Sequence, residues 1–322
     1  MSGAVTQIQP GLWRIRLPFN FELKHINVHL FRLEKGYLLV DCGIGTDECF
    51  AVLEEALASI GVAWPEIKVV LLTHCHPDHV GLAGRVLALS RARALMHGVE
   101  IQQLHAIADW AEHPEQLDGR LLEWGVPEDH VHEISKAFVD VRRSFQRLEN
   151  VEVLGGGEVL YTHIGPLETI WTPGHSPGHL CLYASRDQLL LSGDHVLPSI
   201  TPNIAWMQGA DPLADYLRAL DQVSTLPVKM VLPSHGDPFL DLASRAGETA
   251  AHHESRCKQI LHVVSGHGRT PHEIAAHLWR RTLSPFQQRF ALFEVMAHMV
   301  YLERRGQVVH ESLGGVGHWS SV

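Results

Sequence analysis

The stretch Lys68-Val-Val-Leu-Leu-Thr-His-Cys-His-Pro-Asp-His79 decides the fold. Its first five residues form a nearly continuous apolar run, which is typical of a strand buried on both faces. Alternate residues after a strand end point the same way, so we expect His74 and His76 to share one metal ion. Asp78 and His79 would then turn toward a second ion. Surface histidines at a turn are the alternative, but the complete string after an apolar strand favours a metal site.

Three later segments each place a metal-ligand type of residue at the end of a predicted strand. Two glycines permit tight turns in the first of them. The segments are Thr172-Pro-Gly-His175-Ser-Pro-Gly-His179, Ser192-Gly-Asp194 and Pro233-Ser-His235-Gly. Strands and helices alternate around these motifs in two β-rich stretches, one on either side of a helical segment. The pattern therefore predicts an α/β protein in which two sheets pack as a sandwich with helices outside.

These motifs, in this order, resemble the metallo-β-lactamase fold superfamily, and specifically its glyoxalase II-like and lactamase-β-like dinuclear hydrolases. The resemblance covers residues from about 8 to 240. It implies a four-layer αββα sandwich and two divalent metal ions. Histidine and aspartate donors suit zinc best, and iron or manganese is compatible with the same set.

The resemblance also implies a role for each motif residue. The residues matching the ligands of one ion are His74, His76 and His175. The residues matching the ligands of the second ion are Asp78, His79 and His235. Asp194 matches the carboxylate that bridges the two ions, and Asp41 matches an acidic residue that we interpret as orienting a ligand from behind.

Two neighbouring ions lower the pKa of a bound water and hold a substrate oxygen. We therefore predict hydrolysis of a small ester, thioester or lactone by a metal-bound hydroxide, with Asp78 and Asp194 as the catalytic carboxylates and Asp78 as the proton shuttle. A β-lactam substrate is disfavoured, since such enzymes are usually exported and the chain shows no export signal. The alternative function is an endoribonuclease or phosphodiesterase, because the same ions serve phosphodiester cleavage.

Residues outside the ligand motifs complete the prediction. His25 and His195 are candidates for the substrate pocket, and His179 is interpreted as a buried hydrogen-bonding group. A helical insertion is expected at about 98–150, hypothetically as a cap over the site. Residues 1–240 would form the catalytic domain. Residues 241–322 would form a second domain, with helices at 243–264, 271–279 and 286–304 followed by a hairpin, and this pattern resembles a winged-helix-like tail.

The composition of the chain excludes some classes of protein and disfavours others. The 322 residues are 45% hydrophobic and 19% charged, which excludes a disordered or collagen-like chain. The net charge of −10 disfavours a nucleic-acid partner. From Arg245 onward, however, nine basic residues face six acidic ones, so the tail keeps that option open. Packing or homodimer formation is the preferred role for the tail.

Cysteine use and the terminal sequence predict the compartment. The five cysteines form no Cys-x-x-Cys pair, which favours a reducing environment. No segment has the apolar length of a signal peptide or a membrane span. We therefore expect a cytoplasmic protein with a small-molecule substrate and no membrane partner.

Overall fold

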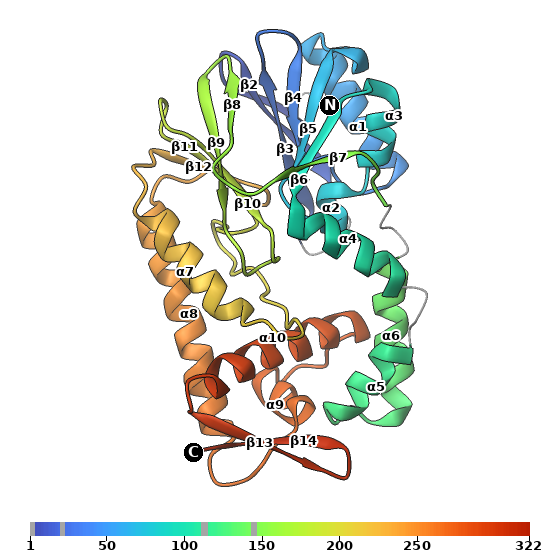
Figure 1. The fold of residues 1–322 in the computed structure, drawn as a ribbon, viewed down its shortest axis with the longest axis vertical. Helices are drawn as coiled ribbons and strands as arrows, with labels where there is room; N and C mark the ends of the chain where they lie inside the picture. Colours follow the sequence, from blue (N-terminus) through green and yellow to red (C-terminus); the bar gives the residue numbers. More distant parts are fainter. Residues whose placement is uncertain (1–3, 20–22, 111–114, 143–146) are drawn as a thin grey trace.

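The structure is a computed structural model, and it describes residues 4–19, 23–110, 115–142 and 147–322. Two β-sheets face each other in the upper part of the molecule, and a helical part lies below them (Figure 1). All five cysteines are buried, and no disulfide bond joins any two of them.

The first sheet has seven strands that follow one another in chain order. Its first four strands pair antiparallel and its last four pair parallel, with β4 belonging to both runs. The strands are β1 (Val5–Gln9), β2 (Leu12–Pro18), β3 (His25–Arg32), β4 (Tyr37–Val40), β5 (Ile67–Leu72), β6 (Arg93–His97) and β7 (Val151–Leu154). The parallel run places the carboxyl ends of β4 and β5 side by side, which brings the segments after them together.

The second sheet has five strands in the order β12-β11-β10-β9-β8. The pairs are antiparallel except for β11 with β12, which is parallel. The strands are β8 (Val159–Thr162), β9 (Gly165–Trp171), β10 (Leu180–Ala184), β11 (Leu189–Gly193) and β12 (Met230–Pro233). Because β11 and β12 run the same way, the segments that begin at Asp194 and Ser234 leave the sheet at the same edge.

Apolar side chains fill the space between the two sheets and the space between each sheet and the helices on its outer face. Leucines of both sheets, such as Leu71 and Leu182, pack between the sheets. The outer face of the first sheet is covered by α1 (Asp47–Ile60) and α3 (Ala83–Ser90). The outer face of the second is covered by α7 (Pro212–Ser224) and α8 (Leu242–Val263). The predicted αββα arrangement is therefore confirmed.

Local sequence explains where the sheet helices begin and end. The Thr46 hydroxyl accepts a hydrogen bond from the Cys49 amide and caps α1, as its position before the helix predicts. Gly61 ends α1 in the left-handed conformation, at φ 81°. The short helix α2 (Pro77–Val80) begins with proline immediately after His76. It is followed by Gly81 and then by α3.

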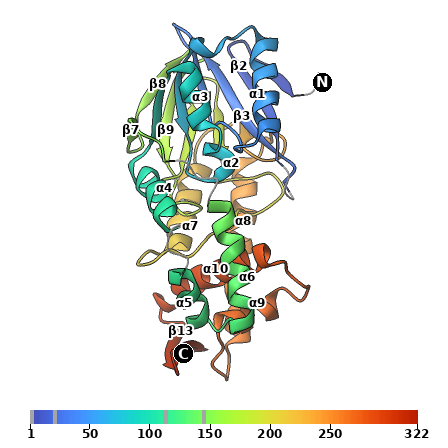
Figure 2. The same ribbon diagram turned by 90° about the vertical axis from the view of Figure 1, so that its right-hand side faces the viewer.

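The helical insertion comprises α4 (Gly98–Trp110), α5 (Glu115–Glu123) and α6 (Glu128–Arg142). The sequence predicts it as a cap over the site, and among the described residues α4 packs along β6 and β7. α5 and α6 extend below the sheets and pack against the C-terminal elements (Figure 2). The physical reason is that Leu121, Trp124 and Ile134 are buried among C-terminal apolar side chains.

The C-terminal elements are α8, α9 (Pro271–Leu278), α10 (Pro285–Glu303), β13 (Val308–Leu313) and β14 (Val316–Ser321). The three helices and the antiparallel hairpin occur where the sequence predicts them. They share one apolar cluster with α5, α6 and α7. The winged-helix likeness and the domain boundary at 240 remain predictions. Of the helices that the structure describes, none combines the length and the apolar character needed to cross a membrane.

Candidate metal centre

The predicted ligands lie on four segments that meet at one edge of the sandwich. His74, His76, Asp78 and His79 follow β5, and His175 lies between β9 and β10. Asp194 directly follows β11, and His235 lies two residues beyond β12. The structure thus brings together all seven residues that the sequence singles out, in two groups that share Asp194.

The first group consists of His74, His76, His175 and Asp194. The Nδ1 atom of His76 lies 2.9 Å from Nε2 of His74 and 3.0 Å from Nε2 of His175. The Asp194 Oδ2 atom lies 3.6 Å from Nε2 of His175. Three imidazole nitrogens and one carboxylate oxygen therefore converge on one point.

The second group consists of Asp78, His79, Asp194 and His235. The Nε2 atom of His235 lies 3.1 Å from Oδ2 of Asp78 and 3.5 Å from Oδ1 of Asp194. The Nε2 atom of His79 also lies 3.5 Å from Oδ1 of Asp194. Asp194 consequently directs one carboxylate oxygen to each group.

Partners on the far side of each ring fix the histidine tautomers. Nδ1 of His175 lies 2.9 Å from the Asn203 carbonyl oxygen, and Nδ1 of His235 lies 2.8 Å from the His25 carbonyl oxygen. A carbonyl only accepts, so Nδ1 is the donor in both rings and Nε2 is the nitrogen that faces the site. Nδ1 of His79 lies 2.8 Å from Oδ2 of Asp41. Asp41 thus lies behind a predicted ligand.

The electrostatics differ between the two groups. Burial and the neighbouring histidines lower the pKa of His76 to about 3 and hold the pKa of His74 well below its ordinary value, so both rings are neutral. Burial alone would lower the pKa of His79, but Asp41, Asp78 and Asp194 outweigh it and raise the pKa well above its ordinary value. Burial alone would raise the pKa of Asp194, but His235 and His79 hold it well below its usual range.

The residues fit a pair of divalent ions. Within the described part of the chain, Nε2 of His79, Nε2 of His235 and Oδ1 of Asp194 are buried without a hydrogen-bond partner. Buried polar atoms are almost always satisfied, so converging polar atoms without a hydrogen-bond partner indicate a site for a metal ion. Imidazole nitrogens with aspartate oxygens form a donor set that zinc and related ions accept.

Two parts of the chain match known protein families. Residues 22–235 match the metallo-beta-lactamase superfamily, and residues 257–319 match the metallo-beta-lactamase-like C-terminal domain. The chain belongs to the metallo-β-lactamase superfamily. Its membership and the shared fold make it a metal-dependent hydrolase of that superfamily.

Individual proteins resemble most of the chain. A crystal structure of a metallo-beta-lactamase family protein from Thermus thermophilus is 31% identical, with a TM-score of 0.84 over 98% of this chain and 100% of that one. The probable metallo-hydrolase YqjP of Bacillus subtilis is 27% identical, over 82% of this chain and 84% of its own length. An atrochrysone carboxyl ACP thioesterase of Aspergillus fumigatus is 22% identical, over 94% and 83% respectively.

Glu100 of this superfamily member was missed by the sequence reasoning. Its side chain is fully buried in the first turn of α4. One carboxylate oxygen accepts a 2.8 Å hydrogen bond from the Cys75 amide, between two predicted ligands, and the other accepts from the Gly178 amide at 2.5 Å. Glu100 therefore ties two ligand-bearing loops together. In the sequence it is one acidic residue at a helix start, and nothing distinguishes it from a surface residue.

His179 and Gly193 form a packed support under Asp194. Nδ1 of His179 lies 2.8 Å from the Thr172 hydroxyl, and its Nε2 accepts from the Asp194 amide at 3.1 Å. Both ring nitrogens are thus used in hydrogen bonds. Gly193 has φ 51°, and a Cβ atom there would lie 2.5 Å from His179 Nε2. Only glycine fits this turn without displacing the ring.

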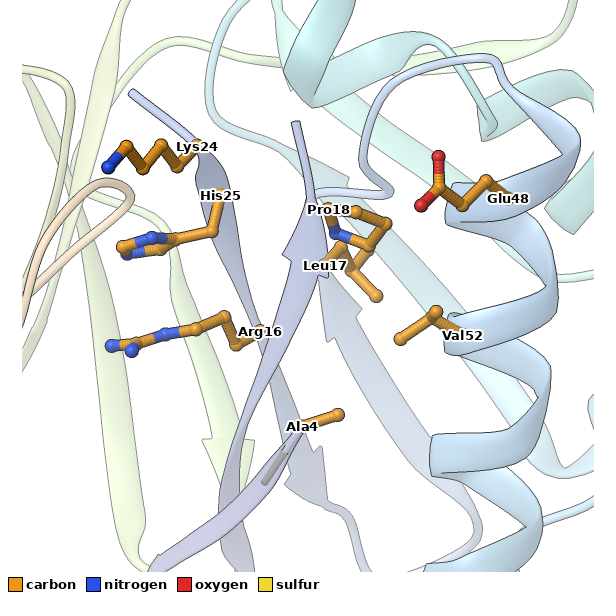
Figure 3. A pocket seen from close by; sticks show the side chains of 8 residues that line it. All are labelled: Ala4, Arg16, Leu17, Pro18, Lys24, His25, Glu48 and Val52. Carbon is orange, nitrogen blue, oxygen red and sulfur yellow. The ribbon is translucent and has the colours of Figure 1, made fainter. Parts of the chain in front are cut away.

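The two pocket candidates lie in different places. His25 helps to line a pocket of about 420 Å³ beside β2, together with Arg16, Leu17 and Val52 (Figure 3). The side chains of Arg16 and His25 point to one side of β2 in this view, whereas Leu17 and Val52 lie on the other. His195 is fully buried, and its ring packs 4.9 Å from the ring of Tyr216. It does not line this pocket.

Proposed function

We propose that the protein is a dinuclear metal-dependent hydrolase of small esters, thioesters or lactones. The observation that carries the proposal is the pair of ligand groups joined by Asp194. Zinc is the proposed metal, with iron or manganese as alternatives. When two ions are bound, they supply a water of lowered pKa and a Lewis acid for the substrate oxygen.

The chain's own residues then have distinct tasks. Asp194 fixes the position of the two ligand groups relative to each other, because each of its carboxylate oxygens faces a different group. Asp78 is the group proposed to hold the proton released during hydrolysis. Its carboxylate is only 11% exposed and lies beside His235. Burial would raise the pKa of Asp78, but His79 and His235 outweigh it and keep the carboxylate ionised and able to accept a proton.

Two observations favour an acyl substrate over a nucleic acid. The 22%-identical relative from Aspergillus fumigatus is named a thioesterase, which supports thioesters as the first class to test. Several basic side chains of the tail also contact the protein itself, since Arg245, Arg304 and Arg305 all bind groups in residues 197–211. Side chains used in this way support a packing role for the tail over nucleic-acid binding. The cytoplasmic location and a homodimer remain proposals.

The test is metal analysis of the purified protein, followed by a panel of thioesters, lactones, simple esters, phosphodiesters and β-lactams. We expect about two ions per chain and turnover of an acyl substrate. His76→Ala and Asp194→Asn should reduce metal content below two ions and reduce kcat/KM by about 100-fold or more. Asp221→Asn, on the exposed face of α7, should match the wild type.

Other outcomes would contradict the proposal. Full activity in the metal-free or His76→Ala protein would exclude a metal-dependent reaction. Turnover of phosphodiesters alone, with RNA binding that weakens steeply as salt increases, would favour the nuclease alternative.

A further inference from the structure

The C-terminal helices hold the loop 194–211, which connects β11 to α7 and begins at Asp194. Arg245 of α8 donates to the carbonyls of Leu197 and Ile200, at 2.7 and 2.8 Å. The Trp206 amide donates to the Phe293 carbonyl of α10, at 3.0 Å. Side chains at the end of α10 bind the last part of the loop. These contacts join Arg304 to the Gly209 carbonyl and Arg305 to Asp211.

One contact in this set reaches the candidate metal centre. Nδ2 of Asn203 lies 3.1 Å from Oε2 of Glu294 on α10, and it also lies 3.4 Å from the Phe290 carbonyl. The backbone carbonyl of the same asparagine accepts the Nδ1–H of His175. A carboxylate of the C-terminal domain is therefore two hydrogen bonds away from a ligand of the first group.

Glu294 is held firmly in this position. Its side chain is 15% exposed, and Oε1 lies 3.4 Å from Nε of Arg256 on α8. The Arg256 guanidinium in turn stacks 4.4 Å from the centre of the Trp279 ring. Burial raises the pKa of Glu294, while Arg256 and Asn203 oppose that effect. A buried carboxylate with one partner on α8 and another on the loop is placed to fix the loop, not to interact with solvent.

We propose that Glu294 is a positioning residue of the metal centre, acting through Asn203 to orient His175. This inference rests on the proposed function, since it takes His175 as a ligand. The carbonyl of Asn203 determines which His175 nitrogen carries the proton and where the lone pair points. Glu294 holds the asparagine that provides that carbonyl, so the C-terminal domain completes the first metal site.

The experiment measures metal affinity, independently of turnover. Apoprotein is titrated with Zn²⁺ against a chromophoric chelator, and with Co²⁺ while the visible spectrum is recorded. Glu294→Ala should weaken the first site about tenfold and alter its Co²⁺ spectrum, since loss of an outer partner of a ligand costs about 10–100-fold. Glu294→Gln keeps an oxygen that accepts from Asn203, so its affinity should stay within about threefold of the wild type even though the ion pair with Arg256 is lost.

Two controls separate positioning from general destabilisation. Leu302→Ala removes a buried side chain of the same helix, and it should lower the Tm of the apoprotein without changing the metal affinity. Asn203→Ala should lose the same affinity as Glu294→Ala, and the double variant should lose little more, because both act through one contact. Asn203→Ala also serves as the test if Glu294→Ala fails to fold.

The results distinguish the inference from the proposed function. If the wild type binds fewer than two ions, the dinuclear function itself fails. If the wild type binds two ions while Glu294→Ala and Asn203→Ala bind equally tightly, the positioning role is wrong. An equal loss of affinity in Leu302→Ala would also overturn it, because a purely structural effect would then explain the change.

Discussion

At the scale of single residues, the hydrogen bond on the outer side of each histidine ring determines which ring nitrogen faces the site. His79, His175 and His235 each meet an acceptor oxygen at Nδ1, and each therefore directs Nε2 into the candidate metal centre. His76 is the exception, because its Nδ1 faces the other two rings of the first group. The oxygens behind the rings therefore orient the nitrogens that face the site, and in metal sites the loss of such a partner costs about 10–100-fold in affinity.

Replacing Asp41 tests this statement at one position. The carboxylate accepts from the Thr73 amide through Oδ1 and meets His79 through Oδ2, a pair of contacts that one amide oxygen cannot reproduce. Asp41→Asn should therefore weaken the second metal site about 10–100-fold in a chelator competition. Its φ of 61° suits asparagine, so the fold should be kept. An affinity within about twofold of the wild type would contradict the assigned role.

At the scale of elements, α4 stabilises the site through Glu100. Glu100→Ala leaves the Cys75 and Gly178 amides buried without an acceptor, so the free energy of unfolding of the apoprotein should fall by about 2–4 kcal/mol. Urea denaturation measures the loss. Glu55→Ala, on the exposed side of α1, should change it by less than about 0.5 kcal/mol. Equal stability of the two variants would show that the loops do not need Glu100.

The contact between α8 and α10 predicts a loss of stability in acid. Nδ1 of His253 lies 3.2 Å from Nε2 of His298, and the Nδ1 of His298 donates to the Glu294 carbonyl. Burial, with the other histidine and Arg256 nearby, lowers the pKa of His253 to about 2, and burial lowers that of His298 to about 4. Both pKa values lie below the ordinary 6.5, so the unfolded chain binds more protons below that pH.

The stability contributed by this neutral pair is complete above pH 6.5 and decreases as the pH falls toward about 4 and 2. Each extra proton on the unfolded chain costs about 1.4 kcal/mol per pH unit. Urea midpoints measured from about pH 7 to 5 should therefore fall less steeply for the double variant His253→Leu/His298→Leu than for the wild type. Parallel slopes would show that these two histidines do not contribute to acid sensitivity.

At the scale of the whole molecule, the sequence predicts the sandwich and the ligand motifs because both produce patterns among residues that are close together in the chain. Buried strands such as 68–72 are apolar runs, and predicted ligands follow directly after them. The strand β1 and the position of α5 and α6 were not predicted, since the short β1 is half polar and helix placement depends on distant partners such as Phe293. Glu100, Asn203 and Glu294 were missed for the same reason: their roles come from contacts 25 to 91 residues away.

Removal of the metal ions should affect the stability of the entire chain. The predicted ligands come from both sheets, so bound ions would join the two halves of the sandwich and would bind only the folded state. An ion present at about 100 times its Kd adds about 2.7 kcal/mol, and chelation should lower the Tm by several degrees. Calorimetry with and without chelator measures the shift. His76→Ala should show a smaller shift, and an unchanged wild-type Tm would mean that the folded protein holds no ion.

The loop 194–211 also has a consequence for biosynthesis. Its partners on α10 extend to Arg305, about 110 residues after Asp194 in the order of synthesis. The two sheets are complete once β12 has left the ribosome, but the Asn203 amide still lacks Glu294 at that moment. On the proposed role of Glu294, the nascent chain acquires its full affinity for metal only after Glu294 itself has been translated. A chain that ends before Glu294 would then lack the partner of the Asn203 amide, and we expect its first metal site to be weakened.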